Sequence, residues 1–170
     1  QPSLTTTRYV GPGLRRALES AGHSEDLTEL HDRYELISHE VRAALNRQEV
    51  AEEVRDLFFP AIRENDQAAM ALFNNLVYIQ EHLSKLVDSG ARHGEMFEGR
   101  ISQLRDQRAR AMSHLDELIC VLEQISVEVP RFAQEPAESA KRQLERLEWT
   151  LDTARQANRE MGEQESERRT

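Results

Sequence analysis

The sequence is poor in the residues that cross-link, break or turn a chain. It has one cysteine, seven glycines and five prolines in 170 residues. A single cysteine, Cys120, excludes a disulfide within the chain, and with it the cysteine framework of small secreted domains. The scarcity of glycine and proline disfavours a sheet protein with many tight turns. We therefore expect long helices and a reducing, cytoplasmic location.

Long apolar runs and excess positive charge are also missing. No segment approaches the roughly 18 apolar residues of a membrane span, and the first residues lack the apolar core of a signal peptide. The chain has 22 basic and 31 acidic residues, for a net charge of −9. Nucleic acid and anionic membranes repel such a chain at long range. We therefore expect neither of them as a partner. Because the sequence begins with Gln1, we also expect it to be a fragment of a longer protein.

The sequence does contain a clear heptad pattern. Over residues 97–129, apolar residues alternate at spacings of four and three, with Ile101 at position a and Leu104 at position d. Helices with this spacing supercoil and interlock their side chains. We expect this set, the 97–129 seam, to be a principal buried surface. Its members are Phe97, Ile101, Leu104, Arg108, Ala111, Leu115, Leu118, Leu122, Ile125 and Val129.

Three further stretches share this period, over residues 24–57, 61–87 and 140–161. The predicted fold class is therefore all-α, an elongated antiparallel helical bundle or coiled coil of about four long helices. Residues 1–23 are expected to form an extended lead-in with a short helix over residues 14–21. Residues 24–165 form the bundle domain, and residues 166–170 form a frayed tail.

Local signals place the helix ends. Ser24 is expected to cap a helix through its hydroxyl. The period shifts at residues 46–49, which indicates either a stutter or a short break. Pro60 either kinks one very long helix or starts a new one, and we favour the kink. The chain is expected to reverse at residues 88–94, where Asp-Ser-Gly is followed by a second glycine. A second break is expected over residues 129–136, with Pro136 in the first turn of the last helix.

No catalytic or metal-binding motif is present. The six histidines form no HExxH pair, and none has a carboxylate three residues before it, as a di-iron bundle requires. Cys120 falls at heptad position f among acidic neighbours, which favours an inert surface thiol. We therefore expect no cofactor, no metal and no enzymatic activity. The histidines are His23, His31, His39, His82, His93 and His114.

Two polar residues occupy seam positions. Arg108 and Asn158 fall at position a of their helices, where polar groups weaken packing but fix register. Either the bundle opens to water there, or a partner inserts its own acceptor. Arg105 belongs with Arg100, Arg108 and Arg110 to the one local basic cluster, which is either a salt-bridged face or an anion site.

Two aromatic residues stand outside the seams. Trp149 falls at position f, on the outside of the last helix, and exposed tryptophans are enriched among interface hot spots. The alternative is that the heptad frame is shifted, or that the helix is covered on two sides. Tyr9 either packs on a groove or belongs to a tail with one apolar spot.

These features predict a non-enzymatic protein-protein interaction module of an intracellular scaffold, tether or adaptor. The expected partners are proteins, including a second copy in a homodimer. A membrane-curvature module, a crescent-type dimer with a cationic face, is the alternative. An enzyme with a site between helices is a third hypothesis. The candidate partner-binding residues are Trp149, Arg108, Arg105, Asn158 and Tyr9.

Overall fold

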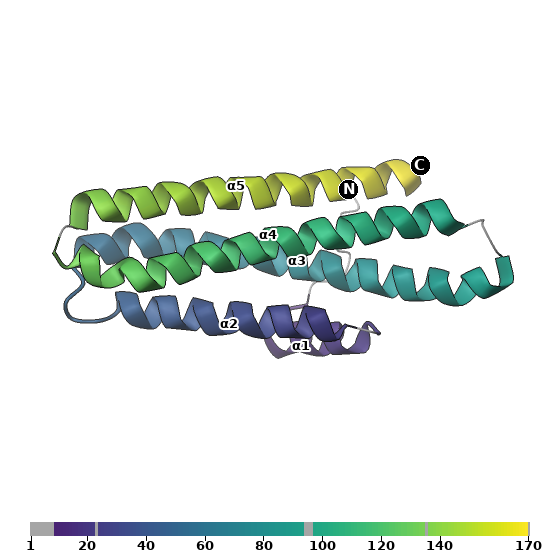
Figure 1. The fold of residues 1–170 in the computed structure, drawn as a ribbon, viewed down its shortest axis with the longest axis horizontal. Helices are drawn as coiled ribbons and strands as arrows, with labels where there is room; N and C mark the ends of the chain where they lie inside the picture. Colours follow the sequence, from purple (N-terminus) through teal and green to yellow (C-terminus); the bar gives the residue numbers. More distant parts are fainter. Residues whose placement is uncertain (1–8, 23, 94–96, 135, 170) are drawn as a thin grey trace.

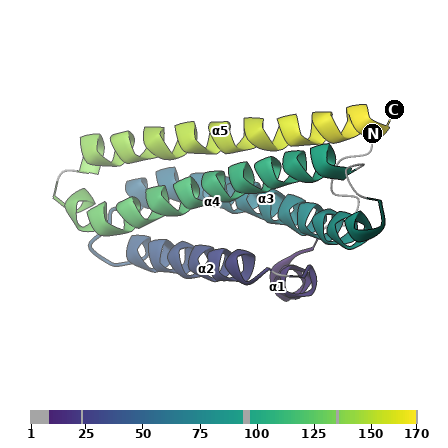
Figure 2. The same ribbon diagram turned by 45° about the vertical axis from the view of Figure 1, so that its right-hand side comes forward.

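Five helices make up the chain in a computed structural model that describes residues 9–22, 24–93, 97–134 and 136–169 (Figure 1). The described part contains no strand, which confirms the all-α bundle. The four long helices alternate in direction, while the short first helix lies beside the start of α2 (Figures 1 and 2). The helices are α1 (Gly11–Ser20), α2 (Glu25–Leu45), α3 (Glu52–His93), α4 (Glu98–Phe132) and α5 (Pro136–Arg169).

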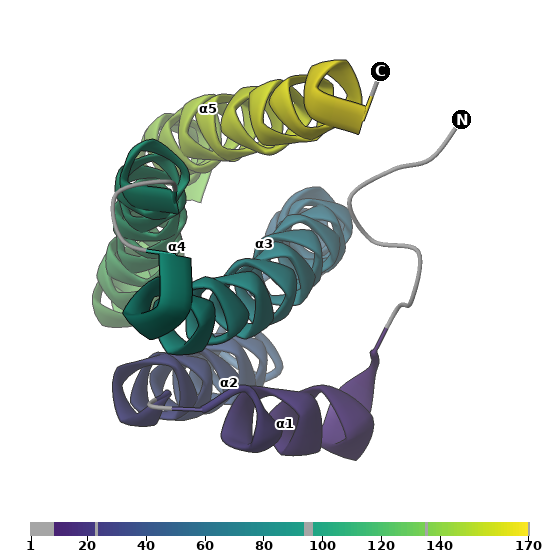
Figure 3. The ribbon, with the colours of Figure 1, turned by 90° about the vertical axis from the view of Figure 1, so that its right-hand side faces the viewer.

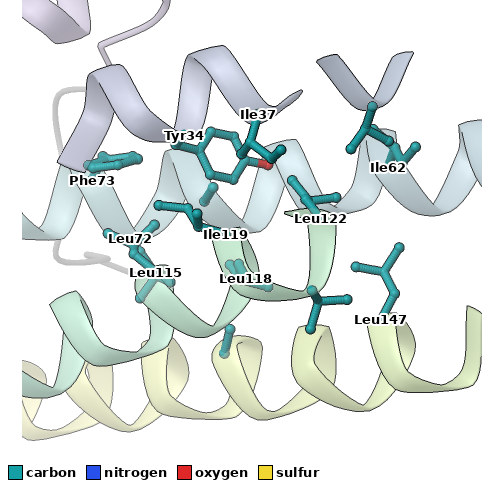
Figure 4. Packing of buried hydrophobic residues seen from close by; sticks show 14 of the residues in the cluster. Tyr34, Ile37, Ile62, Leu72, Phe73, Leu115, Leu118, Ile119, Leu122 and Leu147 are labelled. Carbon is teal, nitrogen blue, oxygen red and sulfur yellow. The ribbon is translucent and has the colours of Figure 1, made fainter. Parts of the chain in front are cut away.

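Together with α3, helix α4 is at the centre of the packing. It packs against α2, α3 and α5, whereas α5 packs on α3 and α4 only, on the far side from α2 (Figure 3). The 97–129 seam is buried as predicted, except that Phe97, Ile101 and Arg108 are half-buried. Figure 4 shows Leu115, Leu118 and Leu122 directed into the space between the helices. Each such leucine contributes about 1.5–3 kcal/mol relative to an exposed position.

Helix α4 also buries residues outside the seam. Ile119 and Val121 are both buried, because neighbouring helices cover α4 on more than one side. A wide apolar stripe of this kind is what distinguishes a core helix from one that packs along a single line.

The first long helix ends where the sequence shows a shift of period. The structure shows a short break at residues 46–51: α2 ends at Leu45 and α3 begins at Glu52. Backbone bonds form the turn, among them those from Asn46 N to Arg42 O at 3.1 Å, from Arg47 N to Ala44 O at 3.3 Å and from Val50 N to Arg47 O at 3.1 Å. Of the two predicted alternatives, a stutter or a short break, the structure therefore confirms the short break, and the helix that contains Pro60 begins at Glu52 instead of residue 24. Backbone bonds of this kind make a turn without glycine or proline.

Pro60 lies inside α3 instead of at a helix start. Its missing N–H and its ring disfavour an interior position by about 3 kcal/mol. Buried neighbours offset this cost, because Phe58 and Ile62 on either side are fully buried. The Phe58 ring also stacks on Phe132 of α4, with 5.4 Å between ring centroids.

The reversal between α3 and α4 lies further along the chain than predicted. Helix α3 continues through Asp88, Ser89 and Gly90 to His93, and α4 begins at Glu98. Gly94 lies outside the described residues. One glycine inside a helix costs only about 1 kcal/mol, which a 42-residue helix tolerates. The antiparallel pairing of the two helices is confirmed, because α3 and α4 pack against each other and run in opposite directions (Figure 1).

At the other connections the proline and glycine signals are mostly right. Helix α5 begins at Pro136 as predicted, although Pro130 lies inside the last turns of α4. Helix α5 runs on to Arg169 and so includes most of the predicted frayed tail. Gly22, at φ 80°, follows α1 and turns the chain toward α2.

Ser24 does not act through its hydroxyl as predicted. It stands at the N-cap of α2 without a side-chain cap bond, and its Oγ instead donates to the carbonyl of Leu18 in α1. The hydroxyl therefore ties α1 to the start of α2. Residues 1–8 of the predicted lead-in lie outside the described residues.

Candidate functional site

The outer face of α5 carries the largest exposed aromatic side chain of the described residues. Trp149 is 68% exposed. Leu147 and Leu151 are buried on the opposite side of the same helix, so the heptad phase places Trp149 correctly. Its predicted role in partner binding stays a prediction.

Contacts to the neighbouring helices define two edges of this face. On the α4 side, Arg146 donates a hydrogen bond to Gln124. On the α3 side, Arg155 pairs with Glu64 at 3.7 Å between Nη2 and Oε2. Trp149 lies between these edges and points away from both neighbouring helices, since a helix turns about 100° per residue. The Thr153 hydroxyl, one turn on, donates to the Trp149 carbonyl at 3.0 Å.

Arg108 is held by acceptors of its own chain. Its Nε donates to Gln80 Oε1 of α3 at 2.7 Å, and its Nη2 donates to Asp26 Oδ1 of α2 at 2.7 Å. The side chain is 20% exposed. Burial tends to raise the pKa of Asp26, but the hydrogen bond and charge of Arg108 outweigh burial, and the pKa lies below its ordinary value. Arg108 therefore joins three helices.

The arginines of the predicted basic cluster around Arg108 differ in their exposure to solvent. Arg105 and Arg110 are exposed, and so is Asp106 between them. Arg105 borders an open groove of about 480 Å³ between α3 and α4, which Val87 also lines. Because Arg108 is engaged in the bundle, the cluster presents less free positive charge than the sequence suggests.

Two asparagines of α3 form hydrogen bonds with the other two candidate partner-binding residues, Asn158 and Tyr9. The side chain of Asn75, which is buried, donates to the Asn158 side chain across the α3–α5 contact. Asn74 binds both backbone groups of Tyr9: Tyr9 N donates to Asn74 Oδ1 at 2.8 Å, and Asn74 Nδ2 donates to Tyr9 O at 3.1 Å. Asn158 and Tyr9 thus both contact α3 of their own chain.

A polar cluster between α2 and α3 was missed from the sequence. The Tyr34 hydroxyl donates to Asp66 Oδ1 at 2.6 Å and accepts from Asn65 Nδ2 at 2.7 Å. Ser38 donates to the same carboxylate at 3.1 Å, and Arg42 pairs with it. Burial, followed by the charge of Asp66, raises the Tyr34 pKa well above 10.0, so the phenol stays protonated. The available signal was the adjacent polar pair at residues 65–66 on an otherwise apolar helix face.

This cluster borders a groove of about 350 Å³ between α1, α2 and α3. His31 and Phe73 also line it and meet edge to face, with 5.0 Å between ring centroids. His31 is buried, and burial lowers its pKa. Its Nε2 lies 3.5 Å from Glu35 Oε1. These side chains offer hydrogen bonds and aromatic contact.

Cys120 is exposed on α4, as predicted. Burial of the sulfur and the charges of Asp116 and Glu123 raise its pKa. The thiol is therefore protonated at neutral pH and is not an activated nucleophile.

Among the side chains that the structure describes, which exclude those of residues 1–8, 23, 90–96, 135–137 and 163–170, no three of His, Cys, Asp or Glu converge on a point that could hold a metal ion. His23 lies outside this part of the chain. Among the same residues, no helix combines the length and apolar character needed to cross a membrane.

Comparisons with protein-family models, with curated proteins and with solved structures found no match.

Proposed function

We propose that the chain is a non-enzymatic protein-interaction module of a cytoplasmic scaffold, tether or adaptor, and that it binds through the outer face of α5. The observation that carries this proposal is the exposure of Trp149, at 68%. A tryptophan buries about 150–250 Å² when a partner covers it. The helix backbone around Trp149 is already ordered by its contacts with α3 and α4, which lowers the entropic cost of binding.

The other candidate residues have different roles. The contacts of Arg108, Asn158 and Tyr9 lie within the chain and support a role in holding the bundle. Arg105 is exposed beside an open groove and serves as a second, weaker contact.

The membrane-curvature alternative requires a cationic, curved face. Its support is the exposed pair Arg105 and Arg110. Against it, Arg108 is paired with Asp26, and the bundle in Figure 1 is extended, without a pronounced bend. Sedimentation with vesicles of anionic lipid tests it: pelleting that salt abolishes favours the alternative, and a chain that stays in the supernatant favours the interaction module.

The interaction proposal is tested by retention of proteins from an extract of the source cells on the immobilised chain. Trp149→Ala is expected to lose retained proteins that the native chain binds. The matched control is Val127→Ala, which removes an apolar side chain that is 78% exposed on α4 and should retain the same proteins as the native chain. Identical retention by the native chain and by Trp149→Ala contradicts the proposal.

A further inference from the structure

Helix α1 covers part of the contact between α2 and α3. It packs on both of these helices near the start of α2 (Figure 3). Among the neighbouring pairs of long helices, α2 and α3 make the least contact with each other. Leu14 and Leu18 of α1 are buried in the same apolar core as Phe73 of α3. Helix α1 therefore occupies part of a groove between α2 and α3.

The sequence of α1 gives it little stability as an isolated helix. It has ten residues, whereas isolated helices shorter than about 12–15 residues are marginal in water. Val10 provides no side-chain cap, the first turn has no acidic residue and the last turn has no basic residue. Two glycines, Gly11 and Gly13, lower its helix propensity further. The order of α1 therefore depends on its contacts with α2 and α3.

The docked α1 fills the groove incompletely. Gly11, Leu14 and Leu18 share one face of α1, because they are spaced by three and four residues. Gly11 has no side chain, and it borders the open groove of about 350 Å³, which Met70 and Phe73 of α3 also line. A Cβ added at Gly11 meets no atom within 4 Å. Because protein interiors are close-packed, a large apolar side chain at this position would gain contacts that α1 does not make.

We propose that α1 occupies, in the free chain, the binding site for an amphipathic helix of a partner protein. Such a helix has large apolar residues at the three positions of this face and a basic residue in place of Arg15. In α1, Arg15 donates to both carboxylate oxygens of Asp32 on α2, at 2.9 and 3.1 Å. The site is separate from the outer face of α5 and does not depend on it.

A second copy of the chain is a poorer occupant than a partner helix. It offers another α1, which leaves the same groove open, so an exchange of α1 between copies makes no new contact with α2 or α3. The tethered α1 also competes at an effective concentration on the order of millimolar. A partner helix therefore displaces α1 only if it fills the space beside Gly11.

The test measures the binding of two fluorescently labelled peptides to the native chain by anisotropy. Both have the sequence of residues 9–20 with Pro12→Ala and Gly13→Ala, so that a helix can continue through position 11. One carries Gly11→Leu and the other carries Gly11→Ala, and these two residues have similar helix propensities. The Gly11→Leu peptide is expected to bind about tenfold more tightly, because only its side chain fills the groove.

Two variants of the chain show where the peptide binds. Arg15→Asp removes the ion pair that holds α1 and leaves Asp32 free for the basic residue of the peptide. It is expected to raise the affinity for the Gly11→Leu peptide about threefold. The matched control is Arg16→Asp, which makes the same change of charge at an exposed residue of α1 and should bind the peptide as the native chain does. Both variants are expected to keep the native helical content, because neither arginine is buried.

Three results would overturn the proposal. Equal affinities of the two peptides would show that the groove beside Gly11 takes no side chain. Equal affinities of the Arg15→Asp and Arg16→Asp chains would show that the peptide binds elsewhere. The third is a native chain that forms dimers which the Gly11→Leu peptide dissociates, because α1 of a second copy is then the occupant. None of these results bears on Trp149, whose variant tests the proposed function separately.

Discussion

Helices α4 and α5 carry the same alternation of threes and fours but lie in different surroundings. Helix α4 packs against three helices and buries Ile119 and Val121 in addition to its seam. Helix α5 packs against two and leaves one whole face to solvent, with Trp149 on it. A heptad seam therefore identifies a helix that packs against another helix. Whether the residues outside the seam are apolar indicates how many neighbouring helices cover it. An exposed tryptophan outside the seam, as at position 149, makes that face a candidate surface contact instead.

The largest expected effect comes from the α4 seam. Leu118→Ala is expected to lower the free energy of unfolding by roughly 2–5 kcal/mol, because it leaves a cavity at a fully buried site. The matched control is Leu36→Ala, which removes the same atoms from a side chain that is 60% exposed and should change stability by less than about 0.5 kcal/mol. Urea denaturation measures both. Equal costs for the two variants would show that α4 is not the core of the bundle.

The polar seam position of α5 comes next. Asn158→Ala is expected to cost about 1–3 kcal/mol, because the buried Asn75 side chain loses its acceptor. Replacing both residues by leucine should recover most of this stability, since no buried polar group is then left without a partner. Urea denaturation of the single and the double variant distinguishes the loss of this hydrogen bond from a loss of packing. A double variant no more stable than Asn158→Ala would contradict the explanation.

The polar seam position of α4 should show a smaller, pH-dependent effect. Arg108→Met is expected to cost about 1 kcal/mol at neutral pH, because Asp26 is half exposed and regains water. The lowered pKa of Asp26 means that the pair stabilises the fold above the ordinary Asp pKa of about 3.9. This contribution disappears as the pH falls through the pKa of the folded state.

Urea midpoints of the native chain and of Arg108→Met should therefore draw closer in strong acid, while the loss of the Arg108–Gln80 hydrogen bond persists there. Arg105→Met, on the exposed side of the same helix, serves as the control and should behave like the native chain at both pH values. A difference between Arg108→Met and the native chain that persists unchanged in acid would show that the ion pair with Asp26 is not its cause.

The smallest expected effect on stability belongs to Trp149. Trp149→Ala is expected to change the free energy of unfolding by less than about 0.5 kcal/mol, because its ring is mostly solvent-exposed. Thermal unfolding at low chain concentration, where no dimer contributes, measures this. A loss comparable to that of Leu118→Ala would place Trp149 in the core and remove the contrast between the two helices.

Periodicity predicted most of the fold, but the ends of the helices depended on local chemistry. The seams of α4 and α5 and the start of α5 at Pro136 could be predicted, because side-chain spacing determines which face is buried. The turn at residues 46–51 has neither glycine nor proline, so the sequence could not distinguish it from a stutter. At Gly90 the opposite occurred: a turn signal lies within α3, which continues to His93.

The candidate site was predictable only where a single helix determines it. The exposure of Trp149 follows from the phase of α5 alone. The partners of Arg108 do not, because Asp26 is 82 residues away in the chain and meets it only in the folded bundle. The cluster around Tyr34 and Asp66 was missed for the same reason, since Tyr34 has the spacing of an apolar seam residue.

The central claim, that Trp149 lies free on the outer face of α5, is tested most directly by tryptophan emission of the dilute chain. Trp149 is the only tryptophan in the sequence, so the spectrum reports this side chain alone. An exposed ring predicts red-shifted emission that a soluble quencher reduces readily, as in the unfolded chain. Blue-shifted emission that resists quenching would show that the ring is buried within its own chain and would contradict the claim.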